Sequence, residues 1–227
     1  MIRSKTAILI FANSAEKEII SKSFSDKSLF ETLNTQTLNI AKKTGLAYFL
    51  FSEKQQIGNS FGERFTNAIQ SVYDKGFDTV ITIGNDTPHL TSKHILKTVE
   101  KLKQHTVVLG PSTDGGFYLM GLNKSQFKKE LFLKLPWQTS KLSRSITKLT
   151  SSNKLAISYL EVLTDIDTAS DIKLVIDSYK TLSKAIYRLL LQSLSIVKKV
   201  ISYHCINLEN FILNPQFNKG SPAYLHL

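Results

Sequence analysis

Cysteine is almost missing from this sequence, since Cys205 is the only one among 227 residues. A single cysteine excludes an internal disulfide framework and a cysteine-based zinc site. It fits a reducing compartment, so we expect a cytoplasmic protein. No apolar run approaches the roughly 18 residues of a membrane-spanning helix. The first residues also lack the cleavage pattern of a signal peptide.

Several catalytic motifs are missing as well. The sequence has no G-x-S-x-G, no phosphate-binding P-loop and no C-x-x-C. Hydrolase, P-loop kinase and thiol-redox functions therefore have no motif support. Internal repeats and low-complexity linkers are also absent, and the simplest organisation is one domain over residues 1–179 followed by a different segment, 180–227.

Acidic residues are few relative to basic ones. The chain has 18 Asp and Glu against 29 Lys and Arg, a net charge of +11. Such a balance is compatible with nucleic acid, anionic lipid or phosphorylated substrates, and equally with a solvated lysine-rich surface. Because no motif of interleaved aromatic and basic residues accompanies the charge, we expect no nucleic-acid partner.

Short apolar runs alternate with amphipathic segments along residues 6–179, which predicts an α/β fold with a layered sheet. The expected strands are Thr6–Ala12, Leu46–Ser52, Asp78–Gly84, Thr106–Gly110, Phe117–Leu122 and Leu155–Leu163. The expected helices are Ser28–Lys43, Phe61–Lys75, Thr91–Lys103, Ser125–Leu131, Thr139–Leu149 and one that follows TDIDTASD.

The segment 180–227 has another pattern. Leu182–Ile206 lacks glycine and proline, and its apolar residues recur at helical spacing among basic ones. A long amphipathic helix is expected there. It would either dock on the domain or on a second copy in a homodimer, or make weak contact with a membrane surface.

Aspartates follow three of the expected strands, at Asp86, at Asp114 and at the pair Asp165 and Asp167. In an open α/β sheet, ligands bind beyond the carboxyl ends of the strands. Mg²⁺ is commonly held there by one or two carboxylates together with substrate phosphates. Each aspartate taken alone could simply start a turn, but their joint placement favours a metal and phosphate site.

Other residues suggest ligand contacts. Gly115 and Gly116 permit close approach to the backbone, or form an ordinary hairpin turn. Gly58 and Arg64 belong to GNSFGERF at a helix start, where a phosphate or carboxylate could bind, although Arg64 could equally be a surface residue. Trp137 could stack on a sugar or base, or anchor the core.

Four segments, IGNDTPHLT, GPSTDGGFYLMGL, PWQTS and DIDTASDI, occur in an order and spacing that resemble the DUF2064 family. These are GT-A-like proteins of the nucleotide-diphospho-sugar transferase superfamily. GNSFGERFTNAI is similar to that family's G-x-x-x-G-E-R-x-x-x-A segment. The resemblance covers about Thr6 to Ile176, and it implies a Rossmann-like three-layer sandwich with a mostly parallel central sheet.

The resemblance also implies a function. It points to a metal-dependent transferase that moves a glycosyl group from a nucleotide-activated sugar to an unknown acceptor, with nucleotidyl transfer as the alternative. Asp86 and Asp167 would hold Mg²⁺ or Mn²⁺, and Asp86 and Asp114 would be catalytic. The expected substrate-binding residues are Asn13, Lys22, Gly58, Arg64, Asn85, Gly115, Gly116, Trp137 and Thr139.

One stretch departs from the family pattern. Members usually have F-x-R-x-P-x-x-G followed by K-T-R-L after the first strand, whereas this chain has FANSAEKEIISKSF over Phe11–Phe24. The proline, glycine and arginines are replaced, and Asn13 and Lys22 are among the polar side chains that remain. A non-catalytic binding protein that lost donor binding at this loop is therefore a further alternative.

Overall fold

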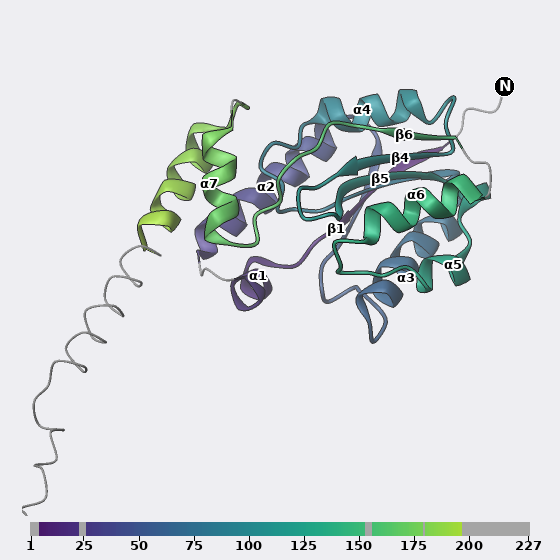
Figure 1. Cartoon of the computed structure of the whole chain (residues 1–227), viewed down its shortest axis with the longest axis horizontal. Helices are drawn as coiled ribbons and strands as arrows, with labels where there is room; N and C mark the ends of the chain where they lie inside the picture. The colour runs from purple at the N-terminus through teal and green to yellow at the C-terminus, as the bar shows by residue number, and fades with distance from the viewer. Residues whose placement is uncertain (1–4, 23–25, 153–155, 179, 197–227) are drawn as a thin grey trace, which may run out of the picture.

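The computed structural model describes residues 5–22, 26–152, 156–178 and 180–196. Its centre is a six-stranded sheet in the order β2–β1–β3–β5–β4–β6 (Figure 1). The strands are β1 (Thr6–Phe11), β2 (Ala47–Phe51), β3 (Thr79–Ile83), β4 (Val107–Pro111), β5 (Phe117–Asn123) and β6 (Ile157–Tyr159). Only β5 runs antiparallel to its neighbours, so the predicted mostly parallel sheet is confirmed.

Helices cover both faces of the sheet, which gives the predicted three layers (Figure 1). One face packs against α2 (Lys27–Lys43) and α4 (Ser92–Lys101), and the other against α3 (Phe61–Asp74), α5 (Lys129–Leu133) and α6 (Leu142–Ser152). All five residues of β3, TVITI, are buried. A strand covered on both faces needs such a continuous apolar or β-branched run, and this run places the end of β3 at the centre of the sheet.

Three segments differ from the sequence-based prediction. Helix α1 (Ala15–Ser21) was not predicted, and it begins where the side chain of Ser14 accepts a hydrogen bond from the Lys17 amide. The predicted helix at Ser125–Leu131 lies later, as α5, after the short 3₁₀ turn η1 (Lys124–Gln126). Strand β6 ends earlier than expected, at Tyr159, although Leu163 still pairs with Ser112 in an isolated parallel bridge.

A C-terminal helix is present and includes residues 184–196. Its residues Ile186 and Leu190 are fully buried against α1, α2 and α7 (Ala169–Asp177). The Ser193 hydroxyl donates to Asp26 Oδ2 at 2.6 Å, at the start of α2. The described part of the helix therefore docks on the domain with its apolar face, while the predicted residues 197–206 lie outside the described ranges.

The division at residue 179, a homodimer and membrane contact remain predictions. No helix among the described residues combines the length and apolar character that crossing a membrane requires.

Candidate functional site

The carboxyl ends of β1, β3 and β4 open into one cavity of about 650 Å³. Its size lies in the range of roughly 300–1,000 Å³ that is usual for ligand pockets. All of the predicted site residues line it except Gly58 and Gly115. The sheet thus brings together residues that are up to 154 positions apart, from Asn13 to Asp167, although their roles stay predictions.

One part of this cavity is an acidic cluster built around one lysine. Lys22 Nζ donates to Asp86 Oδ2 at 2.8 Å and to Asp167 Oδ1, and it lies 3.8 Å from Glu18 Oε2. Only 9% of the Lys22 side chain is exposed. Burial alone would lower the Lys22 pKa, but the attraction of Asp86, Asp167 and Glu18 raises it above its ordinary value. The Lys22 side chain therefore remains protonated, as an ammonium.

Glu18 is a cluster member that sequence reasoning missed. Its side chain is buried, and burial raises its pKa while the Lys22 charge opposes that rise. Glu18 Oε2 has no hydrogen-bond partner among the described residues. The signal was present in the sequence, since Glu18 and Lys22 have the four-residue spacing that joins ion pairs on a helix, but no helix was predicted there.

Asp165 lines the same cavity as this cluster. Its carboxylate accepts a hydrogen bond from the hydroxyl of Thr87, which is buried. Burial raises the pKa of Asp165 well above its usual range, and the nearby charge of Asp86 adds to the rise. The amide of Ile166 donates to the Asp86 carbonyl at 2.9 Å and so ties the two loops together.

In this structure Asp86 and Asp167 do not fit a divalent metal that would use both of them, because Lys22 Nζ already contacts both carboxylates. The described residues contain no group of three or more His, Cys, Asp or Glu side chains spaced to hold a metal ion. Asp86 and Asp167, the predicted ligands, instead share the ammonium of Lys22. The Mg²⁺ or Mn²⁺ site stays a prediction from the family resemblance.

The loop after β1 is closed by hydrogen bonds within the chain. Glu53 accepts from the Ser14 amide at 2.8 Å and from the Ser14 hydroxyl at 2.9 Å. The Asn85 side chain donates to the Asn13 carbonyl at 3.3 Å and to Asn34 Oδ1 at 2.6 Å. Asn13 and Asn85 line the cavity, but these contacts hold the loop in place. The Ser14 amide, at the start of α1, thus already donates its hydrogen bond to the carboxylate of Glu53.

The turn between β4 and β5 fixes Asp114. Its Oδ1 accepts from the Ser112 hydroxyl and from the Gly116 amide, the latter at 2.8 Å, and Oδ2 has no such donor among the described residues. Gly115 has φ +91°, and a Cβ there would lie 2.3 Å from the Ser140 carbonyl oxygen. The glycine is required by this close approach of two backbones. Its amide donates to the Ser112 carbonyl.

Another part of the cavity wall is aromatic. Trp137 packs against the rings of Phe61, Phe65, Phe117 and Phe132, and its Nε1 donates to the Phe132 carbonyl at 2.7 Å. A Cβ on Gly62 would lie 2.4 Å from the Trp137 ring. Trp137 therefore anchors the core and also lines the cavity.

Arg64 comes from the first turn of α3 and lines the same wall. Its side chain makes no hydrogen bond or ion pair within the described ranges. The start of α3 is closed by a capping box, in which Ser60 and Glu63 satisfy each other's amides. Gly58 has φ +141°, and its lack of a side chain allows the backbone to lie close to Glu63 at this cap. Sequence reasoning missed this S-x-x-E pattern.

Thr139 and Gln138 continue the wall. The Thr139 hydroxyl donates to the Pro136 carbonyl at 2.7 Å and closes the turn that precedes α6. Gln138 has φ +57°, and it is the one described residue other than glycine with a positive φ. Non-glycine residues with positive φ are uncommon and often lie at functional sites, so this turn is held by its surroundings.

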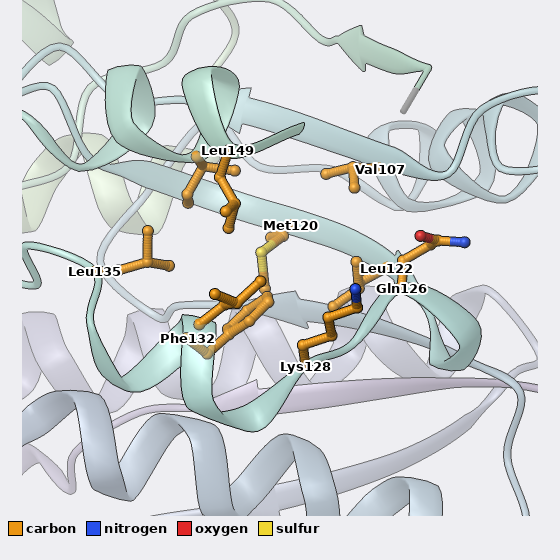
Figure 2. A pocket seen from close by; sticks show the side chains of 10 residues that line it. Val107, Met120, Leu122, Gln126, Lys128, Phe132, Leu135 and Leu149 are labelled. Carbon is orange, nitrogen blue, oxygen red and sulfur yellow. The ribbon is translucent and has the colours of Figure 1, made fainter. Parts of the chain in front are cut away.

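A second cavity of about 150 Å³ lies on the α5 and α6 face of the sheet. Figure 2 shows Met120, Leu122, Phe132, Leu135 and Leu149 around it, with Gln126 and Lys128 at one side. Val107 begins β4 and Leu122 is near the end of β5, so this cavity lies toward the opposite edge of the sheet. Its apolar lining carries none of the predicted site residues.

Part of the chain matches a known family model. Residues 27–139 match the family described as an uncharacterized protein conserved in bacteria (DUF2064). The resemblance read from the motifs is therefore confirmed over this region. No curated protein matches the sequence.

Two solved structures share the fold. A proposed nucleotide-diphospho-sugar transferase from Desulfovibrio desulfuricans G20 aligns with a TM-score of 0.73 and 21% identity, over 87% of this chain and 98% of that one. A 4-diphosphocytidyl-2C-methyl-D-erythritol synthase from Anaerococcus prevotii DSM 20548 aligns with a TM-score of 0.50 and 9% identity, over 86% and 99%. At these identities the likeness establishes the nucleotide-diphospho-sugar transferase fold alone.

Proposed function

We propose that this chain is a transferase that takes a glycosyl group from a nucleotide-activated sugar and passes it to an acceptor hydroxyl. One observation carries the proposal: a single cavity at the carboxyl edge of the sheet combines an oriented carboxylate, a guanidinium with no described partner and an aromatic wall. Each of these suits one part of a nucleotide sugar, and the likeness to transferases of this fold supports the same class.

Arg64 is proposed to bind the diphosphate of the donor. A guanidinium makes paired hydrogen bonds with phosphate oxygens, and that of Arg64 has none to break within the described ranges. Phe117 and Trp137 supply an aromatic surface for the base or sugar. Because Trp137 is already held by packing and by its bond to Phe132, little ordering is needed when a ligand binds.

Asp114 is proposed to act on the acceptor. Two donors hold Oδ1, which fixes the direction of the carboxylate and leaves Oδ2 for the acceptor hydroxyl. In the transfer, the acceptor oxygen bonds to the sugar carbon as the bond to the diphosphate breaks. The hydroxyl proton passes to Asp114, and the nucleoside diphosphate leaves with the electron pair near Arg64. Positioning and charge stabilisation would provide the rate enhancement.

Calorimetry with UDP-, GDP-, ADP- and CDP-linked sugars tests this proposal. We expect one of these donors to bind, Arg64→Ala to weaken that binding by about tenfold or more, and Asp114→Asn to retain binding but lose transfer. Arg144→Ala is the matched control, since Arg144 is an exposed residue of α6 that does not line the cavity. If no donor binds, or if Arg64→Ala behaves like Arg144→Ala, the proposal is wrong.

A second candidate is a non-catalytic binding protein. The observation that favours it is the loop after β1, where Glu53 occupies the Ser14 amide that a donor phosphate could otherwise contact. The same calorimetry separates the two candidates. A nucleotide that binds without any product from a panel of sugar, lipid and peptide acceptors supports the binding protein, whereas a single transferred product excludes it.

A further inference from the structure

The acidic cluster holds a cation that belongs to the chain itself. We propose that the ammonium of Lys22 replaces the divalent metal ion at the Asp86–Asp167 pair, so that the wild-type protein does not take up Mg²⁺ or Mn²⁺ at this position.

The geometry of Lys22 carries this inference. The two carboxylates come from different loops, after β3 and after β6, and each accepts a hydrogen bond from the same nitrogen. A metal that used both carboxylates would have to occupy the space in which Nζ lies. Glu18 closes a third side at 3.8 Å. With 9% of its side chain exposed, Lys22 cannot swing aside without exposing a buried stem and separating both contacts.

The charges have a consequence for ligands. An ammonium contributes one positive charge where Mg²⁺ or Mn²⁺ would contribute two, so the Asp86 and Asp167 carboxylates remain in excess over Lys22. This part of the cavity therefore repels a diphosphate more strongly than a metal-loaded site would. Within the cavity lining the other basic side chains are Lys17 on α1 and Arg64 on α3, and an anionic ligand would be held by them. This consequence rests on the proposed function, whereas the position of Lys22 does not.

Binding of Mn²⁺ alone, without nucleotide, tests the inference. The electron paramagnetic resonance signal of free Mn²⁺ is followed as the full-length protein is added. We expect wild type and Lys22→Arg to leave the signal unchanged, because both keep a cation at the pair. Lys22→Met should bind Mn²⁺ about tenfold or more tightly than wild type, and adding Asp86→Asn to it should remove that binding. Lys17→Gln, a change of another lysine in the cavity lining, should behave like wild type.

Two results would overturn the inference. The first is Mn²⁺ binding to wild type that Asp86→Asn abolishes, which would show that the metal coexists with Lys22 or displaces it. The second is no gain of binding in Lys22→Met, which would show that the two carboxylates form no metal position even without the lysine. Lys22→Gln, which retains a polar side chain, serves in its place if Lys22→Met does not fold. Failure of the donor-binding experiment would leave this result unaffected.

Discussion

The two halves of the cavity are built by different physical means. The aromatic half, formed by Phe61, Phe65, Phe117 and Trp137, is held by ring packing and is continuous with the core. The acidic half, formed by Glu18, Lys22, Asp86, Asp165 and Asp167, is held by charge, with one ammonium between carboxylates from separate segments. The aromatic half should therefore be insensitive to pH and salt, whereas the acidic half should respond to both.

The largest effect is expected in the aromatic half. Trp137→Ala removes a ring that contacts four other aromatic side chains and leaves the Phe132 carbonyl without its donor. We expect the free energy of unfolding to fall by about 2–4 kcal/mol, toward the lower end for a large aromatic truncation because Trp137 is only partly buried. Urea unfolding at low and high salt measures this.

Trp137→Phe is the control for that change, since it keeps a ring and loses the indole hydrogen bond. It should restore most of the loss. A large salt dependence of the Trp137→Ala effect, or an effect no larger than that of Trp137→Phe, would contradict the view that packing builds this half.

A smaller effect is expected from the acidic half. Lys22→Met leaves Asp86 and Asp167 without their shared cation, and we expect a loss of about 1–3 kcal/mol in the free energy of unfolding. The loss is limited because both carboxylates keep some contact with water, with 26% and 50% of their side chains exposed. Lys22→Arg should recover much of it. Equal stability of Lys22→Met and wild type would mean that the ammonium does not hold this half together.

The aromatic half was also the more predictable one from sequence. The helical pattern of Phe61–Lys75 and the strand that begins at Phe117 predict this wall, because apolar periodicity indicates which face of an element is buried. The strand-end aspartates likewise line the cavity, since chain direction alone brings parallel strand ends to one edge.

The contacts of the acidic half could not be predicted in the same way. Lys22 was expected to bind a ligand, but its partners lie 64 and 145 positions away, and only the folded chain shows that it reaches them. The stretch Phe11–Phe24 was treated as an altered loop, so α1 and the Glu18–Lys22 spacing on it were missed. Gly115 was assigned to ligand approach, while its space is filled by Ser140; no local pattern indicates such a contact between distant backbones.

A third prediction uses the pH dependence of stability to distinguish the contributions of individual acidic groups. Burial raises the pKa of Asp165, so the folded protein keeps its proton after the unfolded chain has lost it near about pH 4. Stability from this group is therefore present at low pH and lost as the pH rises toward the raised pKa, by at most about 1.4 kcal/mol per pH unit. Asp165→Asn should lack this pH dependence, so its free energy of unfolding should rise relative to that of wild type between pH 4 and neutral pH.

Glu161 provides the opposite case for comparison. Hydrogen bonds from Lys180 and His94 lower its pKa to about 2, so its contribution is present above the unfolded value of about 4.3 and is lost as the pH falls. Glu161→Gln should therefore be less stable than wild type at neutral pH and equally stable at strongly acidic pH. Urea unfolding over this pH range measures both variants, and parallel curves for Asp165→Asn and wild type would rule out a raised Asp165 pKa.

The smallest effect on stability is expected at Arg64. This residue lies in the aromatic half, but it is proposed to bind a ligand rather than to stabilise the fold. Its guanidinium has no hydrogen bond or ion pair among the described residues, so Arg64→Ala should change the free energy of unfolding by no more than about 0.5 kcal/mol, as Arg144→Ala should. If Arg64→Ala instead destabilises the protein as much as Lys22→Met does, the guanidinium is a structural group. The distinction between a half built by packing and a half built by charge would then fail at the residue on which the proposed donor contact depends.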